Sequence, residues 1–266
     1  MVTDDVDNKN IALLILSFDG AEYLWKYVDQ NLTTFWPDCP YDKFLLTNFK
    51  DFQSNHIENI KVGNDISWSS NLIKALDALV NYEMVLIFLD DCFLLKNVDQ
   101  AELDRLIGCF KDLDGEYLSL KSNKDFKVLE NGLGEISLSS PYRVTPAFGL
   151  FKRLFLLESL KVEENAWKFE RNSSNRTEIS GTKLHCTQEE FFTYLHAIVK
   201  GKWSKKGKNQ FESLNMGSLP KEAELFSMKE IILMRIYEMA RKVILIITPK
   251  NLRKFYVRRG LANLRE

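Results

Sequence analysis

The sequence lacks the patterns that mark the most familiar nucleotide and metal sites. No Gly-x-Gly-x-x-Gly follows an apolar segment, and no Gly-x-x-x-x-Gly-Lys-Ser/Thr occurs in the chain. Hydride transfer on a dinucleotide fingerprint and phosphoryl transfer on a P-loop are therefore disfavoured. The four cysteines form no Cys-x-x-Cys pair, so neither a zinc knuckle nor a disulfide framework is indicated.

Long apolar runs and a strong net charge are also lacking. No apolar stretch reaches the roughly 18 to 20 residues that span a bilayer, and residues 1–10 contain no apolar core of a signal peptide. We therefore expect a cytoplasmic protein, in which the Asn-x-Ser/Thr matches at Asn31, Asn172 and Asn175 are coincidental. The formal net charge of −1 and the absence of recognised RNA-binding modules argue against nucleic acid as a partner.

The most informative segment that is present covers residues 84–95, an apolar stretch interrupted by the adjacent acids Asp90 and Asp91. It predicts a strand buried on both faces of a parallel sheet, and ligands of open α/β sheets bind beyond the carboxyl ends of such strands. Because buried charge needs a cation or hydrogen-bond donors, the pair indicates a bound cation or a polyhydroxylated ligand. The alternative is a turn in which the carboxylates accept backbone hydrogen bonds.

Strands and helices alternate in the first half of the chain. We expect strands at 11–18 and 43–47, a helix after Ser67 or Ser69, either of which can cap it, and a helix at about 100–113. Trp68 is expected in the core. With 266 residues and 45% apolar content, this pattern predicts an α/β fold with a mostly parallel central sheet flanked by helices.

The second half is less regular. Strands are expected at 117–120 and 135–138, and a helix at about 153–160. We expect the polar stretch 171–182 to form a mobile loop. The capping-box spacing that begins at Thr187 predicts a helix through about Val199.

The C-terminal segment is apolar and then basic. Residues 228–247 predict one or two helices that end at or before Pro249, and residues 250–265 alternate apolar and basic side chains. From residue 235 onward there are nine basic residues (Arg235, Arg241, Lys242, Lys250, Arg253, Lys254, Arg258, Arg259, Arg265) and two acids. This pattern favours an anionic membrane surface as a partner, and a helix docked on the protein is the alternative.

Over roughly residues 11–217 the order of features resembles the GT-A glycosyltransferases encoded in bacterial capsule and lipopolysaccharide clusters. The matching pieces are Trp36-Pro37-Asp38, Trp68-Ser69-Ser70-Asn71-Leu72, Phe88-Leu89-Asp90-Asp91-Cys92-Phe93-Leu94, Tyr142-Arg143, Trp167-Lys168-Phe169-Glu170 and Gly201-Lys202-Trp203.

The resemblance implies a GT-A (Rossmann-like) catalytic domain over 1–220, with a donor half at about 11–115 and an acceptor half at 116–220, followed by a basic helical tail at 221–266. It implies a nucleotide-sugar donor, UDP-linked in our interpretation, and a glycan acceptor carried on polyprenyl diphosphate. Such an acceptor places the enzyme at the inner face of the cell membrane, peripherally bound through the tail.

The resemblance also implies roles for individual residues. Asp90 matches the first acid of the family's Asp-x-Asp motif, which holds the donor, whereas Cys92 stands where the last acid holds Mg²⁺ or Mn²⁺. Two alternatives follow, because a hard cation prefers oxygen ligands. Either Asp91 alone anchors the metal, or a basic residue, Arg143 or Lys121, neutralises the diphosphate.

Other roles follow from position and chemistry. Ser17, Asp19 and Asp65 lie at strand ends or just before helices and are expected to bind the donor, although turn and capping roles explain them nearly as well. Glu170 follows two aromatic residues and is the preferred base for an inverting transfer. His185 and His196 are weaker candidates.

Two other functions stay open. A sugar-nucleotide pyrophosphorylase also has an α/β fold with acidic metal ligands, but it needs a Gly-rich, Arg-containing loop that Ser17-Phe18-Asp19-Gly20 does not supply. A non-catalytic member that binds glycan or organises a membrane-associated biosynthetic complex is the alternative from another class.

Overall fold

A computed structural model describes residues 10–199, 201–214, 216–249 and 252. The chain divides into two compact units between Tyr194 and Leu195. The expected boundary near residue 220 falls inside the second unit. All the predicted site residues except His196 belong to the first unit.

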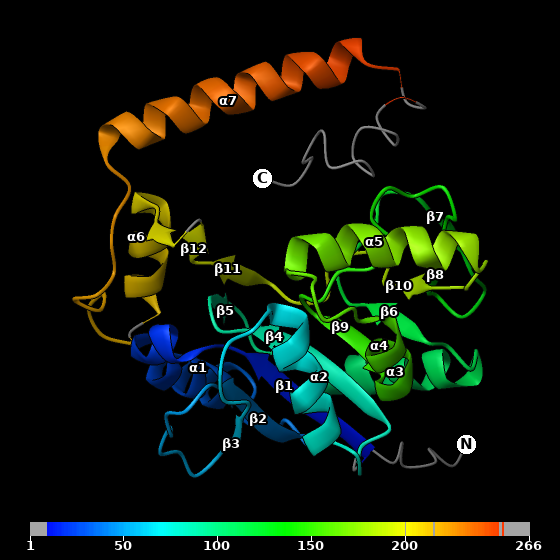
Figure 1. Cartoon of the computed structure of the whole chain (residues 1–266), viewed down its shortest axis with the longest axis horizontal. Helices are drawn as coiled ribbons and strands as arrows, with labels where there is room; N and C mark the ends of the chain where they lie inside the picture. The colour runs from blue at the N-terminus through cyan, green and yellow to red at the C-terminus, as the bar shows by residue number, and fades with distance from the viewer. Residues whose placement is uncertain (1–9, 200, 215, 250–251, 253–266) are drawn as a thin grey trace. The chain divides into compact units, whose positions relative to one another are not determined.

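The first unit is built on one nine-stranded sheet, in the order β3-β2-β1-β4-β9-β6-β10-β8-β7 (Figure 1). Strands β3, β2, β1 and β4 pair in parallel, and β6 pairs in parallel with β10. Strands β9 and β8 are antiparallel to their neighbours. The strands are β1 (Ile11–Leu16), β2 (Asp42–Thr47), β3 (Glu58–Lys61), β4 (Met84–Leu89), β6 (Tyr117–Ser119), β7 (Phe126–Val128), β8 (Gly134–Ile136), β9 (Gly149–Lys152) and β10 (His185–Cys186).

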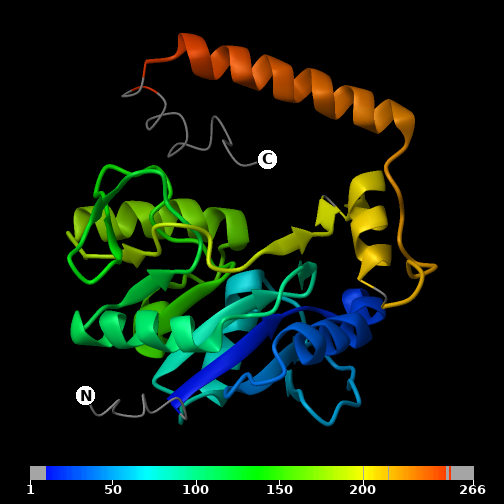
Figure 2. The same cartoon turned by 180° about the vertical axis from the view of Figure 1, so that it is seen from behind.

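Helices flank both faces of this sheet, which confirms the predicted fold class. Helices α2 (Trp68–Ala78) and α4 (Arg153–Ser159) cover the face of the sheet that is turned to the viewer in Figure 1. Helices α1 (Glu22–Phe35) and α3 (Gln100–Asp112) cover the opposite face, which is turned to the viewer in Figure 2. A 3-10 turn, η2 (Asp19–Ala21), leads into α1, and α5 (Ala166–Ile179) follows α4. Of the two serines expected to cap α2, Ser67 is the cap, because its hydroxyl accepts the Ser70 amide at 2.9 Å.

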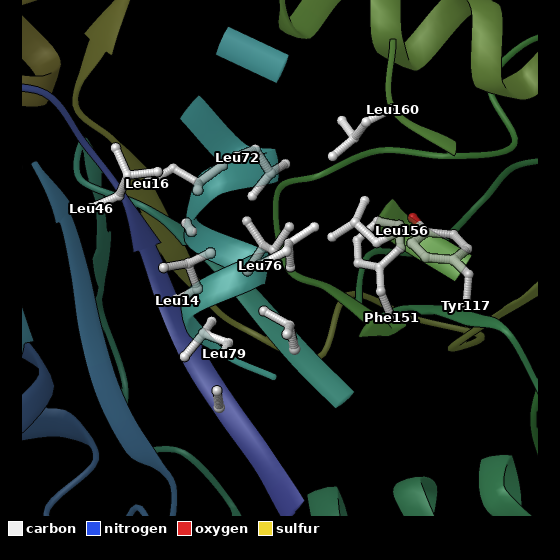
Figure 3. Close-up of a cluster of buried hydrophobic side chains, with 14 of the residues drawn as sticks. Leu14, Leu16, Leu46, Leu72, Leu76, Leu79, Tyr117, Phe151, Leu156 and Leu160 are labelled. Carbon is white, nitrogen blue, oxygen red and sulfur yellow. The ribbon is translucent and has the colours of Figure 1, made fainter. Parts of the chain in front are cut away.

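The alternating side chains of the central strands explain the two helical layers. On β1, Leu14 and Leu16 point into a cluster with Leu72 and Leu76 of α2 and with Leu79, which directly follows the helix (Figure 3). The intervening residues of β1 are equally buried on the opposite face, since all six β1 side chains are buried. Trp68 packs against this core, as expected, with its ring centroid 5.3 Å from that of Phe169.

The prediction of a mobile loop at 171–182 is wrong, because most of this stretch belongs to helix α5. The Asn165 side chain caps the helix by accepting the Lys168 amide at 2.9 Å. Its buried face includes Ser173, Ser174 and Thr177, whose hydroxyls donate to backbone carbonyls. A buried helical face made of small polar residues has no apolar periodicity, so the sequence pattern of this helix resembles that of a loop.

The predicted helix from Thr187 through about Val199 is also wrong. Residues 187–193 are irregular, and β11 (Tyr194–His196) and β12 (Ile198–Val199) follow. The Thr187 amide donates to the Ser119 carbonyl at 2.9 Å, and the Phe191 amide donates to the Leu120 carbonyl at 2.9 Å. These long-range bonds beyond β6 replace the local bonds that a helix needs.

The second unit contains a small hairpin and two helices. Strand β12 pairs with β13 (Lys202–Trp203), α6 (Lys205–Ser213) follows, and α7 (Met228–Ile247) is a single helix that ends before Pro249, as expected. Among the described residues no helix is both long and apolar enough to cross a membrane. The predicted basic and apolar alternation at 250–265 lies, apart from Leu252, outside the described residues.

Candidate functional site at the carboxyl edge of the sheet

The carboxyl ends of β1 and β4 bring Ser17 and Asp90 into direct contact. The Ser17 hydroxyl donates to Asp90 Oδ2 at 2.5 Å. It also accepts a hydrogen bond from the indole Nε1 of Trp25, at 2.7 Å, and Trp25 is only 1% exposed. Because β1 and β4 are adjacent and parallel, residues that directly follow them meet at one edge. The predicted donor residues Ser17 and Asp90 therefore lie together.

The two acids have different surroundings, although both are half-buried. Burial raises the pKa of Asp90 to about 7, the Asp91 carboxylate adds to the increase, and the Ser17 hydrogen bond opposes it. Asp91 Oδ1 accepts from the Cys92 thiol across 3.6 Å. Asp90 is thus held by the Ser17 hydroxyl, whereas Asp91 lies beside the buried Cys92 thiol.

Strand β5 (Cys92–Leu94) directly follows the acids and is held by helix α1. The Asn31 side chain accepts the Leu94 amide at 2.7 Å and donates to the Leu94 carbonyl at 3.0 Å. Asn31 is 2% exposed, so the side-chain amide of this Asn-x-Ser/Thr match is inaccessible from solvent, and both of its polar atoms are hydrogen-bonded to Leu94. This clamp fixes the chain on the far side of the Asp pair, and nothing in the sequence pattern predicted it.

Of the two basic residues that the sequence predicts at the site, Lys121 lies near Asp90 and Asp91. Burial raises the pKa of the Cys92 thiol well above its ordinary value, Asp91 adds to the increase, and Lys121 opposes it. The Lys121 ammonium lies 5.2 Å from the ring centroid of Tyr194. Burial raises the pKa of the Tyr194 phenol, Lys121 lowers it, and Cys92 raises it further. The charges and titratable groups around Asp91 therefore include those of Lys121, Tyr194 and Cys92.

Arg143 is in a different environment. It is 1% exposed, and its Nη2 donates to the Thr182 carbonyl at 2.6 Å. Its backbone amide donates to the Ser174 hydroxyl at 2.9 Å. In this structure Arg143 joins the segment before β9 to helix α5, and its guanidinium has almost no surface to offer a ligand.

Asp19 and Asp65 both lie at the same carboxyl edge, in the loops after β1 and β3. Asp19 Oδ1 accepts the amides of Asn48 at 2.8 Å, Phe49 at 3.2 Å and Lys50 at 3.3 Å, so it holds the loop after β2. Asp65 is exposed and accepts the Asn71 side-chain amide at 2.8 Å. Asp19 therefore shapes a loop of this edge, while Asp65 keeps an accessible carboxylate there.

Glu170 is on α5 and is 8% exposed. Its Oε1 accepts the Thr145 hydroxyl at 2.5 Å, and Thr145 lies in the segment that leads into β9. Of the histidines, His185 is buried on β10, where burial lowers its pKa, and His196 belongs to the second unit. The Glu170 carboxylate, which is the preferred base, is thus buried, and it could reach an acceptor hydroxyl only if the protein opened locally around it.

Two exposed acids that the sequence interpretation did not select, Glu189 and Glu190, follow β10 at this same edge. The chain of pairings from β4 through β9 and β6 gives β10 the direction of β4. Both acids line a cavity of about 390 Å³, and Glu190 is close enough to Tyr194 to raise the phenol pKa. In the sequence these two acids belong to the capping-box spacing that begins at Thr187, which predicts a helix and not a site.

A second cavity, of about 450 Å³, lies at the opposite edge of the sheet, lined by residues that precede β1 and β4 and follow β9, Asn10, Glu83 and Arg153 among them. Ligands of open α/β sheets bind at the carboxyl edge, so this cavity is not part of the candidate site.

The residues present fit a divalent cation held mainly by the substrate. Mg²⁺ and Mn²⁺ prefer oxygen ligands, and Mg²⁺ commonly takes one or two carboxylates together with substrate phosphates. Asp91 offers a half-buried carboxylate, whereas the raised pKa of Cys92 keeps its buried thiol protonated and a poor ligand. Asp91 could therefore serve as a protein ligand for such an ion, and phosphate oxygens of a substrate would have to complete the coordination.

No protein-family model matches the chain, and the search of curated proteins gives no match. Among solved structures, the chain is similar to a crystal structure of S. aureus TarS 1–349, with 11% identity and a TM-score of 0.48, over 70% of this chain. The match spans 59% of that structure's length.

The matches to two other solved structures extend over more of the length of those structures. Apo UDP-glucose pyrophosphorylase matches with 10% identity and a TM-score of 0.45, over 70% of this chain and 93% of that one. CMP:2-keto-3-deoxy-manno-octonic acid synthetase complexed with CTP matches with 12% identity and a TM-score of 0.45, over 67% and 89%. With TM-scores below 0.5 these likenesses carry no functional assignment, which rests on the side chains described above.

Proposed function

We propose that this chain is a GT-A type glycosyltransferase that moves a hexose-like sugar from a nucleotide-sugar donor, UDP-linked, to a lipid-linked surface-polysaccharide acceptor. The observation that carries the proposal is the contact between Ser17 and Asp90, with Asp91 beside it, at the carboxyl edge of a mostly parallel sheet. Two adjacent carboxylates held at this edge suit a ligand that presents both hydroxyls and phosphates.

In this proposal the donor lies across the ends of β1, β3 and β4. Asp90 and Ser17 bind hydroxyls of the ribose or sugar, and Asp65 offers a further acceptor of hydrogen bonds. Asp19 acts through the loop after β2, which it fixes with three backbone amides. Phe18 and Phe49 are 52% and 62% exposed in these loops, so they offer apolar faces for the nucleotide.

The leaving diphosphate gains charge in the transition state, so catalysis requires positive charge placed there in advance. Asp91 would hold a divalent cation, Mn²⁺ or Mg²⁺, which would supply Lewis-acid chemistry at the leaving group. Lys121 supplies a second positive charge near Asp91. Arg143 supports the acceptor half by connecting the segment before β9 to α5.

An inverting transfer needs a base for the acceptor hydroxyl. Glu170 is the carboxylate proposed for this step. Glu190 is the alternative candidate for the base, because it lies at the carboxyl edge and is already exposed. Substituting each by Gln distinguishes them, since the variant that lacks the base loses turnover while its affinity for the donor stays unchanged.

A lipid-linked acceptor, polyprenyl diphosphate in our proposal, places the enzyme at the inner face of the cell membrane. The basic C-terminal segment supports such a location, because positive charge favours anionic lipid surfaces.

The proposal is tested by thermal unfolding with a panel of nucleotide sugars, each with and without Mn²⁺. A ligand that binds only the folded state raises the unfolding temperature. The expected result is a shift with one donor that increases with Mn²⁺, followed by transfer of its sugar to a polyprenyl-diphosphate glycan. If no nucleotide sugar and no free nucleotide shifts the transition, the chain does not use such a donor.

One observation favours a non-catalytic binding or scaffold protein as the second candidate. The position after Asp91 is a buried thiol instead of a carboxylate, which leaves a cation with fewer protein ligands. A thermal shift with a donor, accompanied by neither transfer nor hydrolysis in the presence of Mn²⁺, would favour this candidate.

A further inference from the structure

Helix α7 exposes a continuous apolar face. Ile232, Ile236 and Met239 follow one another at intervals of four and three residues, and they are 52%, 54% and 64% exposed. Met228, Leu233 and Tyr237 widen this face and are also more than half exposed. We refer to these six side chains as the α7 apolar face. Such a stripe on a helix normally lies against another apolar surface.

Polar contacts fix the start of α7 within the second unit. Lys202 Nζ pairs with Glu230 Oε1 at 2.9 Å, and the Ser227 amide donates to Glu230 Oε2 at 2.8 Å. The chain leading to the helix is bound to β13, because the Trp203 amide donates to the Glu224 carbonyl at 2.7 Å. The helix start is therefore held by hydrogen bonds and an ion pair, and the side chains of the α7 apolar face remain exposed within the part of the chain that the structure describes.

The charges around the α7 apolar face are mainly positive. Glu230 is neutralised by Lys202, whose hydrogen bond is the largest cause of a Glu230 pKa lowered to about 2. Lys229 and Arg235 are exposed. The sequence from residue 235 onward adds the excess of basic residues already counted. A surface complementary to this helix is apolar and bordered by negative charge.

We propose that the α7 apolar face docks on an anionic lipid bilayer, with the helix lying in the plane of the interface. In this position the apolar side chains reach the acyl boundary, and Lys229 and Arg235 meet lipid phosphates. The docking site is α7 itself, in addition to any contribution from residues 251–266. This inference rests on the membrane location in the proposed function and assigns that location to α7. A failure to bind vesicles leaves the donor-binding test of the transfer reaction unaffected.

The test measures co-sedimentation of the full chain with phosphatidylcholine vesicles, with and without an equal share of phosphatidylglycerol. Binding is expected to the anionic vesicles and to fall as salt is added. Ile232→Gln/Ile236→Gln is expected to reduce the affinity by about ten-fold or more, because two apolar side chains no longer enter the interface. Lys229→Gln and Arg235→Gln are each expected to reduce it by about five-fold.

The matched control is Val128→Gln/Leu154→Gln, which makes similar apolar-to-Gln changes at two first-unit positions that are 56% and 59% exposed. It is expected to bind like the wild type. Both double variants are expected to keep the wild-type unfolding temperature, since exposed substitutions change stability little.

Three results would overturn the inference. The first is wild-type protein that does not bind anionic vesicles, or binds neutral ones equally well. The second is binding lost on deletion of residues 251–266 but unchanged in Ile232→Gln/Ile236→Gln. The third is a wild-type dimer in lipid-free sedimentation velocity that this variant makes monomeric, because a second copy would then cover the α7 apolar face.

Discussion

Two polar networks in the first unit, one half-buried and one buried, connect different parts of the fold. One consists of Trp25, Ser17 and Asp90 at the open ends of β1 and β4. The other lies around α5, where Thr145 donates to Glu170, and Arg176 and Asn172 donate to Glu164. The first network positions an acid beside half-buried Asp91, whereas the second connects a helix to the segments that precede it.

The difference separates a binding role from a folding role. Removing a donor at the sheet edge leaves a group that water or ligand can reach, while removing one around α5 leaves a buried carboxylate without its partner. We therefore expect substitutions in the first network to change donor affinity more than stability. Substitutions in the second network are expected to do the opposite.

The largest effect on stability is expected for Arg176→Met. Arg176 binds Glu164 through two hydrogen bonds of 2.9 Å, and Glu164 is 4% exposed. Breaking such a pair leaves a buried charge and is expected to lower the free energy of unfolding by about 3 kcal/mol. Urea denaturation measures this change. An equally stable variant would show that the α5 network contributes little to folding.

Thr145→Val should have the next largest effect. The substitution keeps the shape of the side chain but removes the hydroxyl that donates to Glu170 at 2.5 Å. The expected loss of stability is about 1 to 3 kcal/mol, because Glu170 is buried. Thr33→Val, at an exposed position of α1, is the matched control and should remain near the wild-type value. Donor affinity measured by calorimetry should be unchanged in both variants.

Ser17→Ala is expected to change donor affinity more than stability. The Asp90 carboxylate and the Trp25 indole lose their shared partner, but the site is only half-buried, so the stability loss should be about 1 kcal/mol or less. Donor affinity should fall about ten-fold, since Asp90 is no longer held in position. A variant that loses stability but binds the donor normally would remove the distinction between the networks.

The smallest effect concerns pH and belongs to neither network. His185 is 4% exposed, and burial lowers its pKa. The folded chain then binds fewer protons than the unfolded chain near and below about pH 6.5, so stability decreases as the pH falls through that value. Thermal unfolding between pH 7.5 and pH 5, compared with His185→Gln, is expected to show a smaller acid-induced decrease in the variant.

The sequence predicted the strands and helices between residues 11 and 113 well, because buried apolar strands and capped amphipathic helices have characteristic sequence patterns. The end of β4 at Leu89, directly before Asp90, and the Ser67 cap of α2 are examples. It failed at α5 and at residues 187–199. In α5 the buried face carries serine and threonine, and at 187–199 the backbone bonds to the end of β6, far away in the sequence.

The same division holds for the candidate site. Ser17 and Asp90 came together because both directly follow adjacent parallel strands, which the order of elements predicts. The roles of Trp25 and Asn31 depend on where helix α1 packs, and the burial of Arg143 depends on α5. Contacts of this kind are set by tertiary packing and leave no periodic signal in the sequence.

The most direct test of the central claim is a calorimetric titration of UDP with Mn²⁺ into the wild type, Asp91→Asn and Asp77→Asn. Asp77 is an exposed acid on α2 and serves as the matched control. We predict saturable binding to the wild type and to Asp77→Asn, with affinity reduced about 10- to 100-fold in Asp91→Asn. Equal affinities in all three proteins would contradict a nucleotide site at the Asp90–Asp91 pair.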